Sequence, residues 1–167
     1  MSEKETIFSS GIKYKGLFSF KDYYQFCYEW LTEETGLDVG EAKYEEKLSG
    51  DAKNIVVEWV GNDKVTDYFK FQVKVNFQIT GMKNVEVTDG NKKIKTNDGQ
   101  IKIGVKGILI RDYNGKFEKN AFQKFMRSIY EKWVISSRIE QFERKLAEDC
   151  DEFLQQAKAY LDLEGRK

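Results

Sequence analysis

Histidine is absent from this chain of 167 residues. Its absence excludes histidine-activated nucleophiles, proton transfer by imidazole near neutral pH, and most zinc sites, because two cysteines cannot complete a tetrahedral ligand set. Proline is absent too, although average usage of about 5% would give roughly eight residues. We therefore expect no cofactor, no proline-marked domain boundary and no enzyme activity, with an enzyme that uses carboxylates or tyrosines as a minor alternative.

The chain has few cysteines and no long apolar run. Cys27 and Cys150 lie far apart within helical patterns, which favours buried thiols in a reducing compartment over a disulfide. No apolar run approaches the roughly 20 residues needed to span a bilayer, and the first residues lack the basic-then-apolar pattern of a secretion signal. These features predict a cytoplasmic location and no membrane span.

An excess of charge of either sign is also lacking. The chain carries 28 basic and 28 acidic side chains, so its formal net charge is zero. A neutral chain has no overall field that attracts nucleic acid or an anionic membrane surface. We expect neither as the main partner.

Strand patterns dominate the first two thirds of the chain. In "DYFKFQVKVNFQIT", residues 67–80, apolar and polar side chains alternate almost without interruption, which is typical of a strand with one buried face. Similar alternation occurs over residues 7–20 and repeatedly between residues 38 and 112. Turn residues cluster at 61–63, 88–91, 97–99 and 114–115, and short turns join antiparallel neighbours.

Two helical regions frame these strands. The first is predicted over residues 20–35, where Ser19 and Asp22 form a capping pair before an apolar stripe and Gly36 provides a stop. The second is predicted to begin after another capping pair, Asn120 with Gln123, and to run to about residue 163. It carries two apolar stripes whose directions differ by about 120° when each residue turns the helix by 100°.

The stripes change over at Ser136 and Ser137, and paired small hydroxyl residues are places where helices bend. We therefore predict two segments, 119–135 and 138–163. The first stripe contains Phe122, Phe125, Met126, Ile129 and Trp133, and the second contains Ile135, Ile139, Phe142, Leu146, Cys150, Phe153, Ala157 and Leu161.

These elements predict an α+β fold: a strongly bent antiparallel meander of about five to six strands, one N-terminal helix, and a long, kinked C-terminal helix packed on the concave face. We expect residues 1–135 to form a single domain, with segment 119–135 in the concave face. Residues 136–167 would be a helical extension of that domain. Because one straight helix cannot bury both stripes against one surface, the second stripe would need another surface.

Two functions follow from this arrangement. The leading hypothesis is a non-enzymatic protein-interaction or self-assembly module that binds a protein partner or a second copy through residues 138–163. Its contact residues would be Ile139, Phe142, Leu146, Phe153 and Leu161. The alternative is a carrier or sensor of a small apolar ligand held between the sheet and the last helix, lined by Trp59, Phe71, Val73, Val75, Phe77, Ile103, Met126 and Trp133.

Three further positions invite interpretation. Gly104 and Gly107 interrupt the last strand, and glycine within a strand marks a bulge, a bend or a close backbone approach, with contact to a ligand as the alternative. Glu46 alternates with apolar residues and could face inward as an acid or base. A register slip or a strand end that reaches solvent is the simpler interpretation.

The predicted order of elements is similar to that of the START-like or helix-grip superfamily, over residues 6 to about 135. The resemblance implies a curved sheet wrapped around the last helix, often with an apolar pocket. The stretches "KYEEKLSG", "DYFKFQVKVNFQITGMKNVEV" and "NAFQKFMRSIYEKWVISSRIEQFERKL" also resemble segments of archaeal proteins without an assigned function. That second resemblance implies no catalytic residue.

Overall fold

The computed structural model describes residues 3–115, 120–134 and 136–165. Its elements follow one another in the order β1 (Glu3–Phe18), α1 (Phe20–Glu34), β2 (Asp38–Ser49), β3 (Ala52–Lys64), β4 (Phe69–Asp89), β5 (Lys92–Arg111), α2 (Ala121–Ile129), the π-helical turn η1 (Tyr130–Val134) and α3 (Ser136–Glu164). The predicted α+β class is confirmed, with a long C-terminal helix packed against an antiparallel meander.

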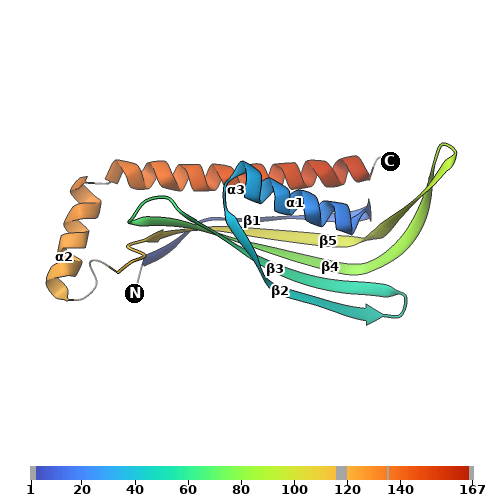
Figure 1. Cartoon of the computed structure of the whole chain (residues 1–167), viewed down its shortest axis with the longest axis horizontal. Helices are drawn as coiled ribbons and strands as arrows, with labels where there is room; N and C mark the ends of the chain where they lie inside the picture. The colour runs from blue at the N-terminus through green and yellow to red at the C-terminus, as the bar shows by residue number, and fades with distance from the viewer. Residues whose placement is uncertain (1–2, 116–119, 135, 166–167) are drawn as a thin grey trace.

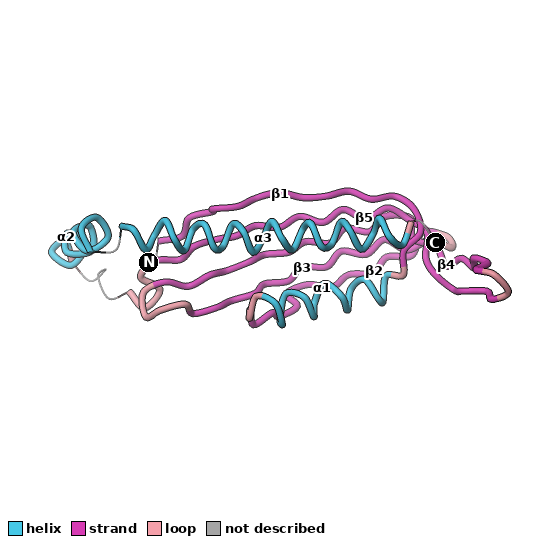
Figure 2. Tube along the Cα trace, turned by 90° about the horizontal axis from the view of Figure 1, so that it is seen from above, coloured by secondary structure: helices cyan, strands magenta, loops and turns pink. Residues whose placement is uncertain are grey.

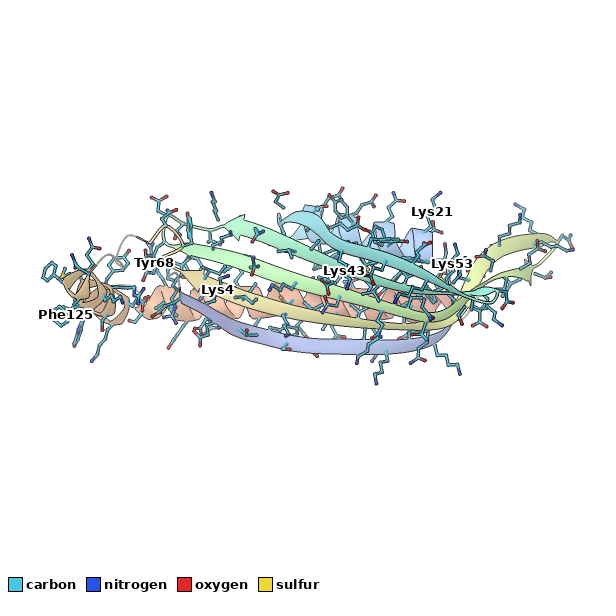
Figure 3. The ribbon with its side chains drawn as sticks, turned by 90° about the horizontal axis from the view of Figure 1, so that it is seen from below. Lys4, Lys21, Lys43, Lys53, Tyr68 and Phe125 are labelled. Atoms are coloured by element: carbon cyan, nitrogen blue, oxygen red, sulfur yellow. The ribbon has the colours of Figure 1, made fainter. Side chains whose placement is uncertain are left out.

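The five strands form one antiparallel sheet in the order β1-β5-β4-β3-β2. Helices α1 and α3 lie side by side on the same face of this sheet (Figures 1 and 2). Within the described residues no helix covers the opposite face, and side chains project from it into solvent (Figure 3). The fold therefore has two layers with one core between them.

The alternating pattern of residues 67–80 produces that core. From Phe69 to Ile79 the odd-numbered side chains of β4 are all buried on the helix side. They pair with buried residues of the neighbouring strands, as Phe77 does with Ile103 and Val57. Burial of each such side chain stabilises the fold by roughly 1.5–3 kcal/mol.

The start and stop signals of the first helix are confirmed. The Ser19 side chain accepts a hydrogen bond from the Asp22 backbone N–H, and Gly36 adopts a φ of 74° beyond the helix end. A cap of this kind stabilises a helix by about 1 kcal/mol. The other predicted cap is also present, since the Asn120 side chain accepts from the Gln123 N–H at 2.8 Å.

Two of the four predicted turns are wrong. Residues 61–63 lie inside β3, and residues 97–99 lie inside β5. Gly61 is needed there for close packing, since a Cβ at this position would lie 3.3 Å from side-chain atoms of both Leu37 and Val39. At Gly99 a Cβ would come within 2.9 Å of the Met82 Cα. Strands β3 and β5 are consequently longer than we predicted from the turn residues.

The β4–β5 hairpin bends towards the helices at its far end (Figure 1). The register between the two strands shifts between Thr80 and Lys83, where Gly81 has a φ of 64°. A bulge of this kind bends a strand and increases its twist. The turn predicted at residues 88–91 closes the hairpin, with Gly90 at a φ of 63°.

The break in the C-terminal helical region is confirmed, but the roles assigned to its two segments are wrong. α3 packs on the sheet, whereas α2 lies across one end of the molecule (Figure 1). η1 separates them, and a π turn rotates the direction of an apolar stripe because it adds a residue to the turn. Ile135, which we assigned to the second stripe, lies outside the described residues.

Candidate functional site

The second stripe, predicted to bind a partner, is covered by the sheet. Leu146, Phe153 and Leu161 are buried, and Ile139 and Phe142 are half-buried against the same core. The Phe142 ring lies 4.9 Å from the Phe69 ring at the sheet surface. The sheet itself therefore buries the second stripe, and no partner protein is needed to cover it.

The residues predicted to line a ligand cavity fall into two groups. Six are buried in the core: Trp59, Phe71, Val73, Val75, Phe77 and Ile103. The other two, Met126 and Trp133, are exposed at the end of the molecule and do not face them. A cavity between α1, α3 and the sheet has a volume of about 10 Å³, which is at the lower limit of the roughly 10–15 Å³ needed to hold a single water.

The first stripe, predicted to fill the sheet, is exposed instead. Phe122 is 69% exposed and Trp133 is 74% exposed, and Phe125, Met126 and Ile129 are also classed as exposed. All five belong to α2 or η1 and point to one side of the helix at 100° per residue. We call this surface the α2 apolar face.

Ion pairs on the opposite side of α2 hold the helix in this orientation. Arg127 Nη2 lies 3.0 Å from Glu3 Oε1, and Arg127 Nη1 lies 3.8 Å from Asp112 Oδ2. The side chains of Arg127 and Asp112 are only 14% and 1% exposed. Because Glu3 begins β1 and Asp112 follows β5, the charged side of α2 faces the sheet and its apolar side faces solvent.

A second set of contacts secures η1 in the same way. Glu131 accepts a hydrogen bond from the Tyr68 hydroxyl and pairs with Arg111 at 3.4 Å. Arg111 also pairs with Glu5 of β1 at 3.0 Å. Burial, with a further contribution from Glu131, raises the pKa of Tyr68 above its usual range, so this hydroxyl stays a donor at physiological pH.

Sequence reasoning missed this ion-pair cluster. Arg127 and Glu131 are spaced i, i+4, which marks one polar side of the helix. Their partners, however, come from β1, the residue before β4, the last residue of β5 and the residue after it. Only the sheet register brings these positions together, and no local pattern in the sequence indicates it.

Glu46 lies at an exposed strand edge. Its register partner in β3 is the buried Ile55, so Glu46 shares the face that the helices cover, but β2 is the outermost strand and Glu46 is exposed. The Tyr44 hydroxyl donates to Glu46 Oε1 at 2.8 Å. The exposure predicted for Glu46 is therefore present, but it results from the position of β2 at the edge of the sheet and not from a strand end or a register slip at this residue.

The two cysteines are free and buried. Burial raises the pKa of both Cys27 and Cys150 to about 12, so neither forms a thiolate nucleophile near neutral pH. Across the described residues, no group of three or more acidic, cysteine or histidine side chains is placed to hold a metal ion. Among those same residues, no helix is both long and apolar enough to cross a membrane.

Comparison with known proteins gave no family model, curated protein or solved structure that matches this chain. The resemblances to the helix-grip superfamily and to archaeal proteins therefore stay predictions.

Proposed function

We propose that this protein is a self-assembly module that forms a homodimer by packing the α2 apolar face against the same face of a second copy. The observation that carries this proposal is the orientation of α2, whose charged side is bound to the sheet while its apolar side faces solvent. An amphipathic helix normally buries its apolar side. Here that side has no partner within the described part of the chain.

The size of the face is suited to a dimer. Since an aromatic side chain can bury roughly 150–250 Å², the exposed fractions of these five side chains correspond to a face on the order of 500 Å². A patch of this size is at the upper end for a monomeric protein and is often functional. Two such faces together approach the total of about 1,000 Å² expected of a specific interface.

The surrounding charge favours a second copy over an anionic bilayer. Helices that lie in a membrane surface keep basic residues on their polar side free to meet lipid phosphates. On α2 the Arg127 guanidinium is instead paired with Glu3 and Asp112. Lys124 and Lys132 are exposed, but two lysines on a chain with zero net charge give little attraction to a bilayer.

The oligomeric state of the purified protein tests the proposal. We expect light scattering to give twice the chain mass, and Trp133→Glu or Phe125→Glu to give a monomer, because each buries a charge at the centre of the interface. Leu48→Glu is the matched control. Leu48 is another exposed apolar residue, at 75%, but it lies on β2, so this variant should stay dimeric.

Two results would overturn the homodimer. One is a wild-type protein that stays monomeric at high micromolar concentration. The other is a monomer that sediments with phosphatidylserine vesicles and loses this binding in Trp133→Glu, which would assign the face to a membrane surface. Circular dichroism of each variant establishes whether the fold is intact before either result is interpreted.

The proposed module is cytoplasmic and non-enzymatic. Two buried free thiols suit a reducing compartment. A carrier function with its ligand beneath α3 receives no support from the cavity of about 10 Å³ found there.

A further inference from the structure

A separate groove opens between the first turns of α1, strand β2 and the bent part of the β4–β5 hairpin. Its volume is about 640 Å³, which lies within the range of roughly 300–1,000 Å³ that is usual for small-molecule sites. The groove is lined by Phe20, Lys21, Tyr24, Glu41, Tyr44, Met82 and Asn97. None of these residues takes part in the α2 apolar face or in the ion-pair cluster.

Three aromatic rings from two elements border this groove. Phe20 and Tyr24 lie on α1 with ring centroids 5.7 Å apart and planes at 81° to each other. Tyr44 contributes a third ring from β2 and is 45% exposed. The edge-to-face packing of Phe20 and Tyr24 holds both rings in place, and the partly exposed rings of Tyr24 and Tyr44 are the ones open to a ligand.

Both tyrosine hydroxyls are bound to carboxylates. The Tyr24 hydroxyl donates to Glu41 Oε1 at 2.6 Å and accepts from Trp59 Nε1 at 3.1 Å. The Tyr44 hydroxyl donates to Glu46 Oε1 at 2.8 Å. These bonds hold the two tyrosine side chains in place, and Glu41 is the carboxylate that lines the groove itself.

The other lining groups do not oppose a cation strongly. Asn97 is already committed, since its Oδ1 accepts from the Phe20 N–H at 3.0 Å and its Nδ2 donates to Asn84 at 2.8 Å. Met82 is buried and gives the groove an apolar wall. Lys21 is exposed and projects from the first turn of α1 towards solvent (Figure 3).

We propose that this groove binds a small organic cation through a quaternary ammonium group. Such a group needs no hydrogen-bond partner, is attracted to the faces of aromatic rings and is neutralised by a nearby carboxylate. A bare metal ion would require several oxygen ligands, which this largely apolar lining does not supply. A neutral apolar ligand would gain nothing from the charge of Glu41.

Choline and its neutral isostere 3,3-dimethyl-1-butanol provide the test. The indole N–H signal of Trp59 is the reporter in a two-dimensional NMR titration, because that N–H donates to Tyr24 at the groove wall. We expect a saturable shift with choline, and binding of the neutral alcohol about tenfold weaker, the ratio that corresponds to about 1.4 kcal/mol of cation–π attraction.

Variants of Tyr44 show whether choline binding depends on an aromatic ring or only on apolar contact. Tyr44→Phe should retain choline binding, whereas Tyr44→Leu should weaken it at least severalfold, since leucine keeps the apolar contact but removes the ring. Tyr28→Leu is the matched control, because the Tyr28 ring also touches Trp59, at 5.9 Å, but does not line the groove. Glu41→Gln should weaken choline binding and leave the alcohol unaffected.

Three outcomes would overturn the proposal. They are equal affinity for choline and the alcohol, no saturable shift with choline up to high millimolar concentration, and unchanged choline binding in Tyr44→Leu. The dimer does not enter this test. Failure here leaves the α2 proposal untouched, and a monomeric protein can still bind choline.

Discussion

Gly107 lies where α3 packs tightly on the sheet. A Cβ at this position would lie 2.8 Å from Cys150 Sγ and 3.2 Å from Leu146 Cγ, and both residues are buried on α3. β1 also has a bulge here, since its register with β5 shifts between Thr6 and Phe8. The glycine that we assigned to a bend, a bulge or a close approach thus lies at a close approach, with a bulge beside it.

Replacement of Gly107 by alanine should lower the stability of the fold. The added methyl group must displace α3 or rearrange Leu146 and Cys150, and overpacking of a core costs about 1–3 kcal/mol. Gly104→Ala is the matched control, because a Cβ on Gly104 meets nothing within 4 Å. Urea unfolding measures both variants. A loss in Gly104→Ala as large as that in Gly107→Ala would refute the steric explanation.

At the scale of elements, the ion pairs to Arg127 should decide whether α2 keeps its place. Arg127→Gln removes the 3.0 Å pair with Glu3 and one charge beside the buried Asp112. Loss of a hydrogen-bonded charge of this kind costs about 1–3 kcal/mol. We expect faster hydrogen exchange of the α2 amides in this variant, with the amides of α3 still protected.

Lys124→Gln provides the control for this prediction. It removes a positive charge from the same helix, but from an exposed position, where substitutions change stability by no more than about 0.5 kcal/mol. Equal exchange rates in the two variants would mean that net charge, rather than the specific pairs, positions α2.

The exchange of roles between the two helical segments has a traceable cause in the sequence. An apolar stripe indicates that one side of a helix is buried or can bind another surface, but it does not identify that surface. The lengths of the helix and of the strands do identify it. β1 has 16 residues and spans roughly 50 Å at 3.3 Å per residue, and only the 29-residue α3, about 44 Å long at 1.5 Å per residue, can follow it.

The wrongly predicted turns hid this length match. If residues 61–63 and 97–99 were turns, β3 and β5 would be shorter than they are. A short helix would then be long enough to cover the sheet. Both glycines in those clusters serve close packing inside a strand. Such packing depends on partners distant in sequence, Leu37 and Val39 for Gly61, so no local pattern distinguishes it from a turn.

On the scale of the whole molecule, the proposed sites lie at opposite ends. α2 crosses one end of the sheet, whereas the groove lies beside the start of α1, near the bent hairpin at the other end (Figure 2). The rigid layer of α3 on the sheet separates them. A dimer through α2 would therefore leave both grooves open to solvent.

Two phenylalanine substitutions distinguish the buried core, which contains Phe153, from the exposed α2 apolar face, which contains Phe125. Phe153 on α3 is 1% exposed and its ring lies 5.7 Å from that of Trp30 on α1, so Phe153→Ala should lower the free energy of unfolding by about 3–5 kcal/mol. Phe125 on α2 is 61% exposed, and Phe125→Ala should change the stability of the monomer by less than about 0.5 kcal/mol. Urea unfolding of both, at a concentration below that of dimer formation, isolates the fold from the association. A large loss in Phe125→Ala under those conditions would mean that its ring is part of the core, and that the α2 apolar face is not a free surface.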